Sequence, residues 1–237
     1  GCRSQKQPVR STDLYRNRND ERLRRRFLLG GGRDMPDYEL LELLLTIAIP
    51  RRDVKPLAKE LIRKFGSFAG VVNAPLEELM LVKGVKENTA AVLRIVRECS
   101  VRSSWQSLKG MDAPVISDFD AMVDYCRSAM AYQMVEEFRI IFLNSKLYVI
   151  GEEIQQRGTV DQVAIHPREV IKSAMMHGAS AMILVHNHPS GIVTPSKADM
   201  EITKRIKEAA EAVSIRLFDH LIISKSSVYS FHNQGFV

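Results

Sequence analysis

The chain has 237 residues, of which 45% are hydrophobic and 26% are charged, a composition that is typical of globular proteins and sufficient for two ordinary domains. No segment has the apolar length that a membrane span needs, and the first residues contain no apolar signal region, so we expect a cytoplasmic protein without a membrane partner. The three cysteines form no Cys-x-x-Cys pair, which argues against a disulfide framework and against a cysteine zinc site.

The net charge of +6 is unevenly distributed along the chain. Residues 1–104 contain 21 Lys and Arg against 13 Asp and Glu, a net charge of +8, whereas residues 105–237 contain 13 against 15, a net charge of −2. Because a basic surface attracts phosphates, this asymmetry assigns any binding of a polyanion to the N-terminal part.

The first segments of the chain predict a basic arm and then a helical domain. Residues 1–20 are polar and basic without hydrophobic periodicity, so we expect a flexible arm. Apolar residues at helical spacing in 37–45 and 53–65 predict core helices, so we expect a small all-α domain over residues 21–104. Near its start is an arginine run that either neutralises nucleic-acid phosphates or forms a solvated helix face. The run includes Arg24, Arg25 and Arg26.

Residues 75–93 contain two helical patterns joined by a tight turn at Gly84, which resembles a helix-hairpin-helix. In that motif, a Gly-hydrophobic-Gly turn lets backbone N–H groups at a helix N-terminus approach a DNA phosphate. Lys86 occupies the position of the second glycine, where its side chain either obstructs that approach or partly replaces the lost contact by its charge. We therefore predict DNA binding at Gly84 and Lys86, with a helical packing module as the alternative.

The second half of the chain predicts an α/β domain. Gly110 and Pro114 indicate a linker over residues 105–116. A helix, a strand hairpin turned at residues 144–146, a helix, a strand, a loop, a helix and a final strand follow in that order. We expect a mixed sheet flanked by helices over residues 117–237, and the pattern indicates no particular oligomeric state.

The end of the strand predicted at residues 181–185 carries the pattern of a metal site. His186 and His188 follow this strand two residues apart, so their side chains share one face. An irregular loop rich in proline and glycine leads to Ser196, which begins a helix whose first turn brings back Asp199. Two imidazoles and a carboxylate suit Zn²⁺ and leave a fourth position for a water of lowered pKa, although affinity alone does not exclude other first-row metals.

The same residues have a plainer interpretation. Ser196 and Asp199 also match a capping box, in which they only satisfy the free N–H groups of a helix. A single histidine at a strand end is also more often a hydrogen-bonded polar residue than a ligand. The complete string, His-x-His, seven residues, Ser, two residues and Asp, resembles the signature of the JAMM (MPN-plus) metalloproteases, and this favours the metal site.

Motifs on either side of the histidine string indicate a particular family among proteins with this signature. Gly-Thr-Val-Asp at residues 158–161, His-Pro-Arg-Glu-Val at 166–170 and Asp-His-Leu-Ile-Ile at 219–223, together with the histidine string, resemble the RadC family of bacterial proteins from about residue 20 onward. The resemblance implies a JAMM-like C-terminal domain, a helix-hairpin-helix-like N-terminal domain and a name linked to DNA repair. It also implies a zinc-dependent peptidase or isopeptidase that acts on a protein or peptide. The implied metal ligands are His186, His188 and Asp199, and Ser196 stands at the position that assists the oxyanion.

The resemblance further implies a glutamate base at the start of a strand. Glu136 matches this position best, because it precedes an apolar strand, and Glu152 and Glu153 are the alternatives. In the last strand only one of Asp219 and His220 can point toward the metal, since neighbouring side chains in a strand alternate between faces.

Three functions are consistent with these patterns. The first is a zinc-dependent amide hydrolase in which Glu136 moves the proton and Ser196 steadies the oxyanion. The second is a DNA-associated repair factor whose metal site acts on nucleic acid or is silent. The third is a pseudoenzyme or interaction module, for which a complete ligand set is unexpected.

Overall fold

The computed structural model describes residues 11–158 and 165–237, so residues 159–161 of the Gly-Thr-Val-Asp motif lie outside the described part. The chain divides into two compact units, Gly1–Arg97 and Glu98–Val237. The described residues of each unit form a hydrophobic core.

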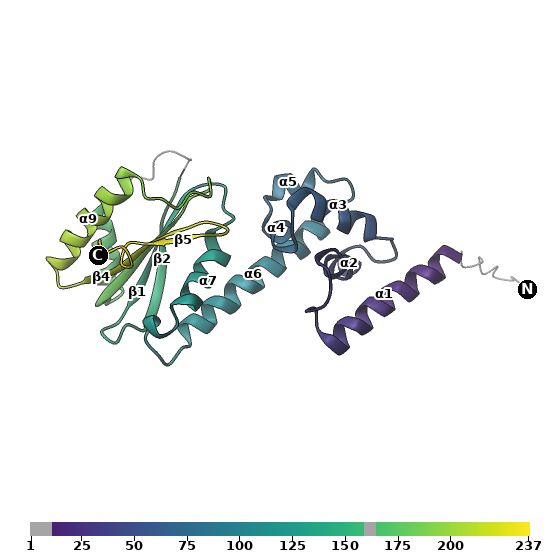
Figure 1. The fold of residues 1–237 in the computed structure, drawn as a ribbon, viewed down its shortest axis with the longest axis horizontal. Coiled ribbons are helices and arrows are strands. Elements are labelled where there is room, and N and C mark those ends of the chain that lie inside the picture. The colour runs from purple at the N-terminus through teal and green to yellow at the C-terminus, as the bar shows by residue number, and fades with distance from the viewer. Residues whose placement is uncertain (1–10, 159–164) are drawn as a thin grey trace, which may run out of the picture. The chain divides into compact units, whose positions relative to one another are not determined.

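The N-terminal unit is built from helices around a single core. Leu41, Leu61, Leu79 and Leu93 are fully buried there, as their helical spacing predicts. The all-α character predicted for this part is confirmed. The helices are α1 (Ser11–Gly30), α2 (Asp37–Ala48), α3 (Lys55–Phe65), α4 (Phe68–Asn73), α5 (Leu76–Met80) and the first part of α6 (Glu87–Lys109) (Figure 1).

Helix α1 begins inside the segment that we expected to be a flexible arm. Arg and Leu make up half of its 20 residues, and both have high intrinsic helix propensity. A helix therefore forms without the apolar periodicity on which the prediction relied. The structure corrects the prediction for residues 11–20, and residues 1–10 lie outside the described part.

Helix α6 continues through the first part of the predicted linker. It ends at Lys109, so the linker expected over residues 105–116 is helical as far as residue 109. The Trp105 ring lies 5.0 Å from that of Tyr125, and Leu108 is buried in the core of the second unit. Trp105 and Leu108 are three residues apart and share one helix face, which the nearby Gly110 and Pro114 obscured in the sequence.

The C-terminal unit contains a five-stranded mixed sheet in the order β2-β1-β3-β4-β5. Strands β3 and β4 are parallel, and the other neighbouring pairs are antiparallel. The predicted α/β class is confirmed. The elements are a 3-10 turn η1 (Val115–Asp118), α7 (Phe119–Met130), β1 (Glu137–Leu143), β2 (Val149–Arg157), α8 (Pro167–Met176), β3 (Ala181–Asn187), α9 (Lys197–Glu211), β4 (Arg216–Ile223) and β5 (Val228–Ser230).

Helices cover both faces of this sheet. Helix α7 packs on one face, against residues such as Ile141 and Ile183, whereas α8 and α9 pack on the other, against Ile140 and Leu184 (Figure 1). Because β1 and β3 are buried on both faces, their sequences are nearly continuous apolar runs. A polar residue in β3 is therefore an exception that needs a partner.

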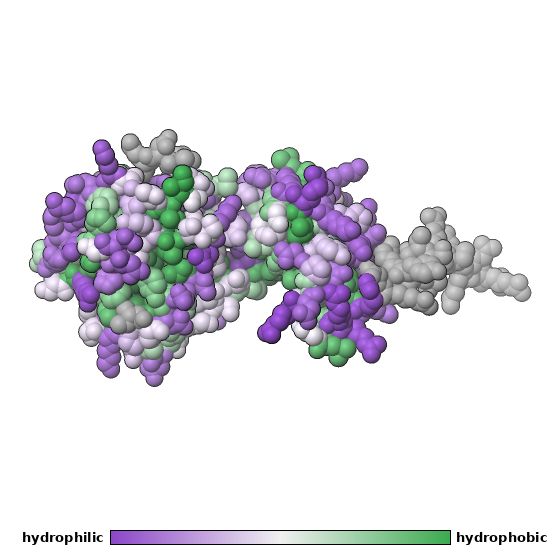
Figure 2. Space-filling view, viewed as in Figure 1, coloured by the Kyte–Doolittle hydropathy of each residue, from purple (hydrophilic) through white to green (hydrophobic). Residues whose placement is uncertain are grey.

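The surface seen in Figure 2 is mainly hydrophilic, with small hydrophobic areas on both units. Among the residues that the structure describes, no helix is both long enough and apolar enough to cross a lipid bilayer.

A buried ion-pair network joins the first two strands to α7. Glu137, which is 1% exposed, accepts hydrogen bonds from Arg139 and Arg157, both at 2.5 Å. The Nη1 atom of Arg139 donates to the Tyr125 hydroxyl at 2.9 Å and to the Glu152 carboxylate at 3.1 Å. The network satisfies charges that would otherwise be buried without partners, so removing one member leaves the charge of another less fully compensated.

We predict that Glu137→Ala lowers the free energy of unfolding by about 3–5 kcal/mol, because Arg139 would keep its charge in a buried position. Trp105, the sole tryptophan of the chain, packs in this unit, so its fluorescence during urea denaturation reports on the relevant transition. In the control variant Asp124→Ala, an exposed pair with Arg127 is lost and the change should stay below about 1 kcal/mol. Equal effects of the two variants would contradict the role of the network.

Candidate metal centre

Three side chains converge where β3 ends and α9 begins. The Nε2 atom of His186 lies 2.9 Å from Nε2 of His188 and 3.2 Å from Oδ1 of Asp199. The Nε2 atom of His188 lies 3.6 Å from Oδ2 of Asp199. Within residues 11–158 and 165–237, these three form the one group of histidine, cysteine and acidic side chains with the spacing of a metal site.

The local fold explains why the two histidines face one way. His186 is in β3, opposite Phe138 of β1, and the backbone N–H of His188 continues the ladder to Ile223 of β4 at 3.0 Å. Because side chains alternate along a strand, positions 186 and 188 share the face that α9 covers. Gly191, with a φ of 86°, then allows the chain to turn away from the sheet.

Asp199 serves the helix and the site together. Ser196 caps α9: its Oγ accepts the N–H of Asp199 at 3.1 Å, and Asp199 Oδ2 accepts the N–H and the O–H of Ser196, each at 2.7 Å. The capping box weighed in the sequence analysis is therefore present. It leaves Oδ1 facing His186, so capping and metal binding are compatible.

The donor set fits a tetrahedral metal ion. Ligand atoms about 2.0–2.1 Å from such an ion lie about 3.3 Å from one another, and the observed separations of 2.9, 3.2 and 3.6 Å bracket that value. The Nδ1 atom of His188 faces the carbonyl oxygen of Ile192 at 2.6 Å, so Nδ1 carries the proton and the neutral ring presents a lone pair at Nε2. Lone pairs brought this close need a cation or a proton between them.

The charges of these groups are coupled. Burial raises the pKa of Asp199, but its close contacts with the His186 and His188 rings outweigh burial and hold that pKa well below its ordinary value. The hydrogen bond to Asp199 is the main cause that raises the pKa of His188, and burial opposes it. The site therefore keeps an anionic carboxylate and attracts positive charge.

Glu136 lies beside this group. Continuing the register that pairs Phe138 with His186 by two residues places Glu136 opposite His188 and on the same face of the sheet. The charge of Glu136 contributes to the raised pKa of His188, which also indicates proximity. Its backbone carbonyl accepts the N–H of Gly158 at 3.1 Å, so the segment is tied to β2 as well.

The side chain of Asn187 binds the backbone of the segment that contains Glu136. It lies between the two histidines, is fully buried and points to the opposite face of the sheet. Its Oδ1 accepts the N–H of Glu137 at 2.8 Å, and its Nδ2 donates to the carbonyl of Val135 at 3.1 Å. The Asn187 amide therefore forms hydrogen bonds to the backbone on both sides of Glu136.

The alternative bases lie elsewhere. Glu152 and Glu153 are paired with β1 residues four or five positions along the strand from Glu136, or about 13–16 Å away. Glu152 accepts a hydrogen bond from Tyr125, and Glu153 accepts one from Ser173 at 3.0 Å. The strand register therefore favours Glu136 over these two as the carboxylate beside the histidines.

Of the two neighbours Asp219 and His220 in β4, only His220 points toward the metal centre, as strand alternation predicts. Nε2 of His220 lies 2.8 Å from Nδ1 of His186, whereas Asp219 points to the other face and accepts hydrogen bonds from Ser230 and from the backbone of His232. Burial is the main cause that lowers the pKa of His220 well below its ordinary value and raises that of Asp219. Asp219 thus connects β4 to β5 and the residues that follow it.

Sequence reasoning missed two residues that support the site: Thr203, and Asn187, which binds the backbone on both sides of Glu136. The hydroxyl of Thr203 contacts His220 and the backbone of Asp199. The i, i+4 spacing of Asp199 and Thr203 was the available signal, because it puts both on one face of a helix.

Comparison with known proteins agrees with this geometry. A family model described as a RadC-like JAB domain matches residues 116–236, which include every residue of the site described above. The chain belongs to the RadC family. The JAMM-like fold predicted for the C-terminal part is confirmed, and a second model, described as UPF0758 N-terminal, matches residues 16–91 of this RadC-family chain.

Two relatives of the RadC-family chain extend over almost its whole length. A UPF0758 protein of Ruegeria pomeroyi is 49% identical over 217 residues, which cover 92% of this chain and 96% of the relative. A UPF0758 protein of Rhodobacter capsulatus is 50% identical over 213 residues, which cover 90% and 99%.

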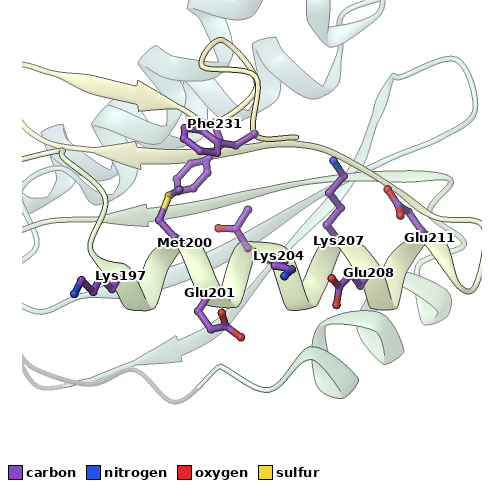
Figure 3. A pocket seen from close by; sticks show the side chains of 10 residues that line it. Lys197, Met200, Glu201, Lys204, Lys207, Glu208, Glu211 and Phe231 are labelled. Atoms are coloured by element: carbon purple, nitrogen blue, oxygen red, sulfur yellow. The ribbon is translucent and has the colours of Figure 1, made fainter.

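A pocket of about 540 Å³ lies along α9 of this RadC-family protein, bounded by α9 and by Phe231 and Phe236. Met200 points from the helix toward Phe231 (Figure 3). The three candidate ligands are absent from its lining, but Thr203, which contacts Asp199, contributes to it. The pocket therefore adjoins the metal centre and is not part of it.

The residues predicted to contact nucleic acid lie on separate elements of the N-terminal unit. Arg24, Arg25 and Arg26 are exposed on α1, and Arg26 pairs with Glu39 at 2.6 Å. The turn between α5 and α6 contains Gly84, with a φ of 101°, and the exposed Lys86. The glycine turn is thus present as predicted.

We predict that the affinity of the site for zinc falls as the pH falls. The folded-state pKa of His188 is raised above its ordinary value of 6.5, so the proton that competes with the metal is lost only above that value. Below the raised pKa the apparent Kd should increase about tenfold per pH unit, and above it this dependence should disappear. Chelator competition between about pH 5.5 and 8.5 measures the curve, and a flat curve would exclude this coupling.

Proposed function

We propose that the protein is a zinc-dependent hydrolase of amide bonds, a peptidase or isopeptidase that acts on a protein or peptide. One observation carries the proposal: the ligand atoms of His186, His188 and Asp199 lie 2.9, 3.2 and 3.6 Å apart, close to tetrahedral spacing. Continuing the register of β1 against β3 by two residues would bring Glu136 opposite His188. A metal site with three protein ligands and a nearby carboxylate is typical of catalytic zinc centres.

The residues divide the chemistry among them. His186, His188 and Asp199 would hold Zn²⁺, which supplies a Lewis acid that polarises a carbonyl group and lowers the pKa of water. Glu136 accepts a proton at its carboxylate and returns it to the leaving amine. Ser196 donates its hydroxyl proton to Asp199 here, so it must turn away from that oxygen before it can donate to an oxyanion.

The surroundings of the site favour an amide substrate over a phosphodiester. Residues 105–237 carry a net charge of −2, which does not attract a polyanion. Two exposed apolar side chains are close in sequence to site residues. Met134, which is 59% exposed, is two residues before Glu136, and Ile192, which is 65% exposed, is four residues after His188. Such residues are suited to contact a polypeptide.

The first experiment measures zinc in protein purified without chelator. Wild type should contain about one zinc per chain, and the His186→Ala/His188→Ala variant should contain little, because both imidazole ligands are lost. Absence of zinc in wild type, even after zinc is added, would contradict the proposed site.

Glu136→Gln should keep the zinc but reduce hydrolysis by about 10²–10⁴-fold, because an amide cannot accept the proton. Cleavage of a random peptide library, detected as new amino termini by mass spectrometry, provides the assay. Glu153→Gln, on β2, is the matched control and should hydrolyse normally. Full activity of Glu136→Gln would reject this residue as the base, and a zinc-loaded wild type that nicks DNA but leaves peptides intact would reject the amide substrate.

A second candidate function, DNA binding, concerns the N-terminal unit. The net charge of +8 over residues 1–104 and the Gly84 turn, flanked by the exposed Lys83 and Lys86, favour it. Backbone N–H groups at the start of α6, together with these lysines, would contact phosphates. In this function the N-terminal unit recruits the hydrolase to DNA, and the two proposals are compatible.

We expect binding to a random-sequence 20-base-pair duplex to weaken as salt is added, because phosphate contacts release counterions. Lys83→Ala/Lys86→Ala should reduce the slope of log K against log salt by up to about two units. Lys172→Ala/Lys204→Ala, in the other unit, should leave that slope unchanged. Binding that does not depend on salt would rule out the phosphate contacts.

A further inference from the structure

A line of buried hydrogen bonds runs from α9 to the first histidine of the metal centre. Thr203 Oγ1 lies 2.5 Å from the carbonyl oxygen of Asp199 and 2.6 Å from Nδ1 of His220. Nε2 of His220 lies 2.8 Å from Nδ1 of His186. All three side chains are buried: Thr203 is 3% exposed, His220 0% and His186 5%.

The direction of the first two bonds follows from the number of available protons. A hydroxyl has one hydrogen, and a backbone carbonyl can only accept, so Thr203 donates to Asp199. The Thr203 oxygen can then only accept from His220, which requires the proton of that ring to be on Nδ1.

The direction of the last bond follows in turn. His220 is fully buried, with its ring stacked on Phe231 at 4.8 Å and edge-on to Phe138 at 5.8 Å, and such surroundings favour the neutral ring. A neutral ring with its proton on Nδ1 accepts at Nε2. His186 must therefore donate from Nδ1, which leaves its own Nε2 without a proton.

We infer that Thr203 and His220 are positioning residues that hold His186 in the tautomer whose Nε2 lone pair faces the metal centre. The tautomer itself is independent of the function proposed above, whereas its consequence for metal binding rests on the proposed zinc site. His188 is held in the same tautomer without an intervening side chain, since its Nδ1 donates directly to the carbonyl oxygen of Ile192. Because the Thr203 hydroxyl ends on the backbone of Asp199, the line also connects His186 to the third ligand.

The test compares two substitutions of similar size at Thr203. Thr203→Val keeps the shape but removes the hydroxyl, so His220 loses the acceptor for its Nδ1 proton and can carry it on Nε2 instead. His186 would then have to accept at Nδ1, and its proton would move to Nε2, where a metal must bind. Thr203→Ser retains the hydroxyl and serves as the rescue variant.

Two measurements are made on the full chain. Long-range ¹H–¹⁵N correlation spectra of the metal-free protein at about pH 8.5, where histidines are ordinarily neutral, identify the protonated nitrogen of each ring. Zinc affinity is obtained by competition with a fluorescent chelator. We expect His186 and His220 to be protonated at Nδ1 in wild type and in Thr203→Ser. In Thr203→Val, His186 should move toward the Nε2 form, and zinc should bind about 10–100-fold more weakly.

Several outcomes would overturn the inference. One is a wild-type protein with His186 protonated at Nε2, a result that does not depend on any variant. Another is a folded Thr203→Val protein, judged by its Trp105 fluorescence, with unchanged histidine spectra and unchanged zinc affinity. A third is Thr203→Ser with the same loss of affinity as Thr203→Val. If wild type binds no zinc, the proposed function fails, and the spectra of the metal-free protein still decide the tautomer.

Discussion

The arrangement of the site depends on the pairing of β3 with its two neighbours. The antiparallel partner β1 pairs Phe138 with His186, and continuing this register places Glu136 opposite His188; the parallel partner β4 brings His220 against His186. Both pairings are backbone ladders within a sheet buried on two faces, so each side chain is set by register rather than by loop conformation. A shift of one residue in either ladder would turn the corresponding group to the face covered by α7.

The helix that follows β3 has a comparable influence. Asp199 is in the first turn of α9, where the unpaired N–H groups and the helix dipole favour a negative charge. The capping box, the dipole and the two histidines all stabilise the same anionic carboxylate, and together they outweigh the cost of its burial. Helix capping would thus favour metal binding at the same carboxylate, although the sequence presents the two as competing interpretations.

The part of the site that sequence could predict is the part determined by local geometry. The face shared by His186 and His188 follows from the period of a strand, and the return of Asp199 follows from a capped helix. Glu136 required the register of β1 against β3, two strands distant in sequence, which resemblance indicated and periodicity could not. Thr203 and Asn187 look like ordinary helix and strand residues until the partners of their polar atoms are known.

The fold was predictable to a similar degree and for the same reason. Helices with apolar residues at regular spacing, such as α2 and α3, were expected within a few residues of their positions. The first part of helix α1 was not, because its apolar residues show no helical periodicity, and the end of α6 was not, because Trp105 and Leu108 pack on a core that is distant in sequence.

The hydrogen bonds that Asn187 makes to the backbone around Glu136 determine how folding and metal binding would be related. The contacts that place the carboxylate are made by sheet backbone and a buried amide, with no ion among them. In zinc fingers the polypeptide becomes ordered only when metal arrives, so losing the ion means losing the fold. Here protein hydrogen bonds alone hold the backbone around Glu136, so, under the proposed function, the fold of this segment would not depend on metal binding.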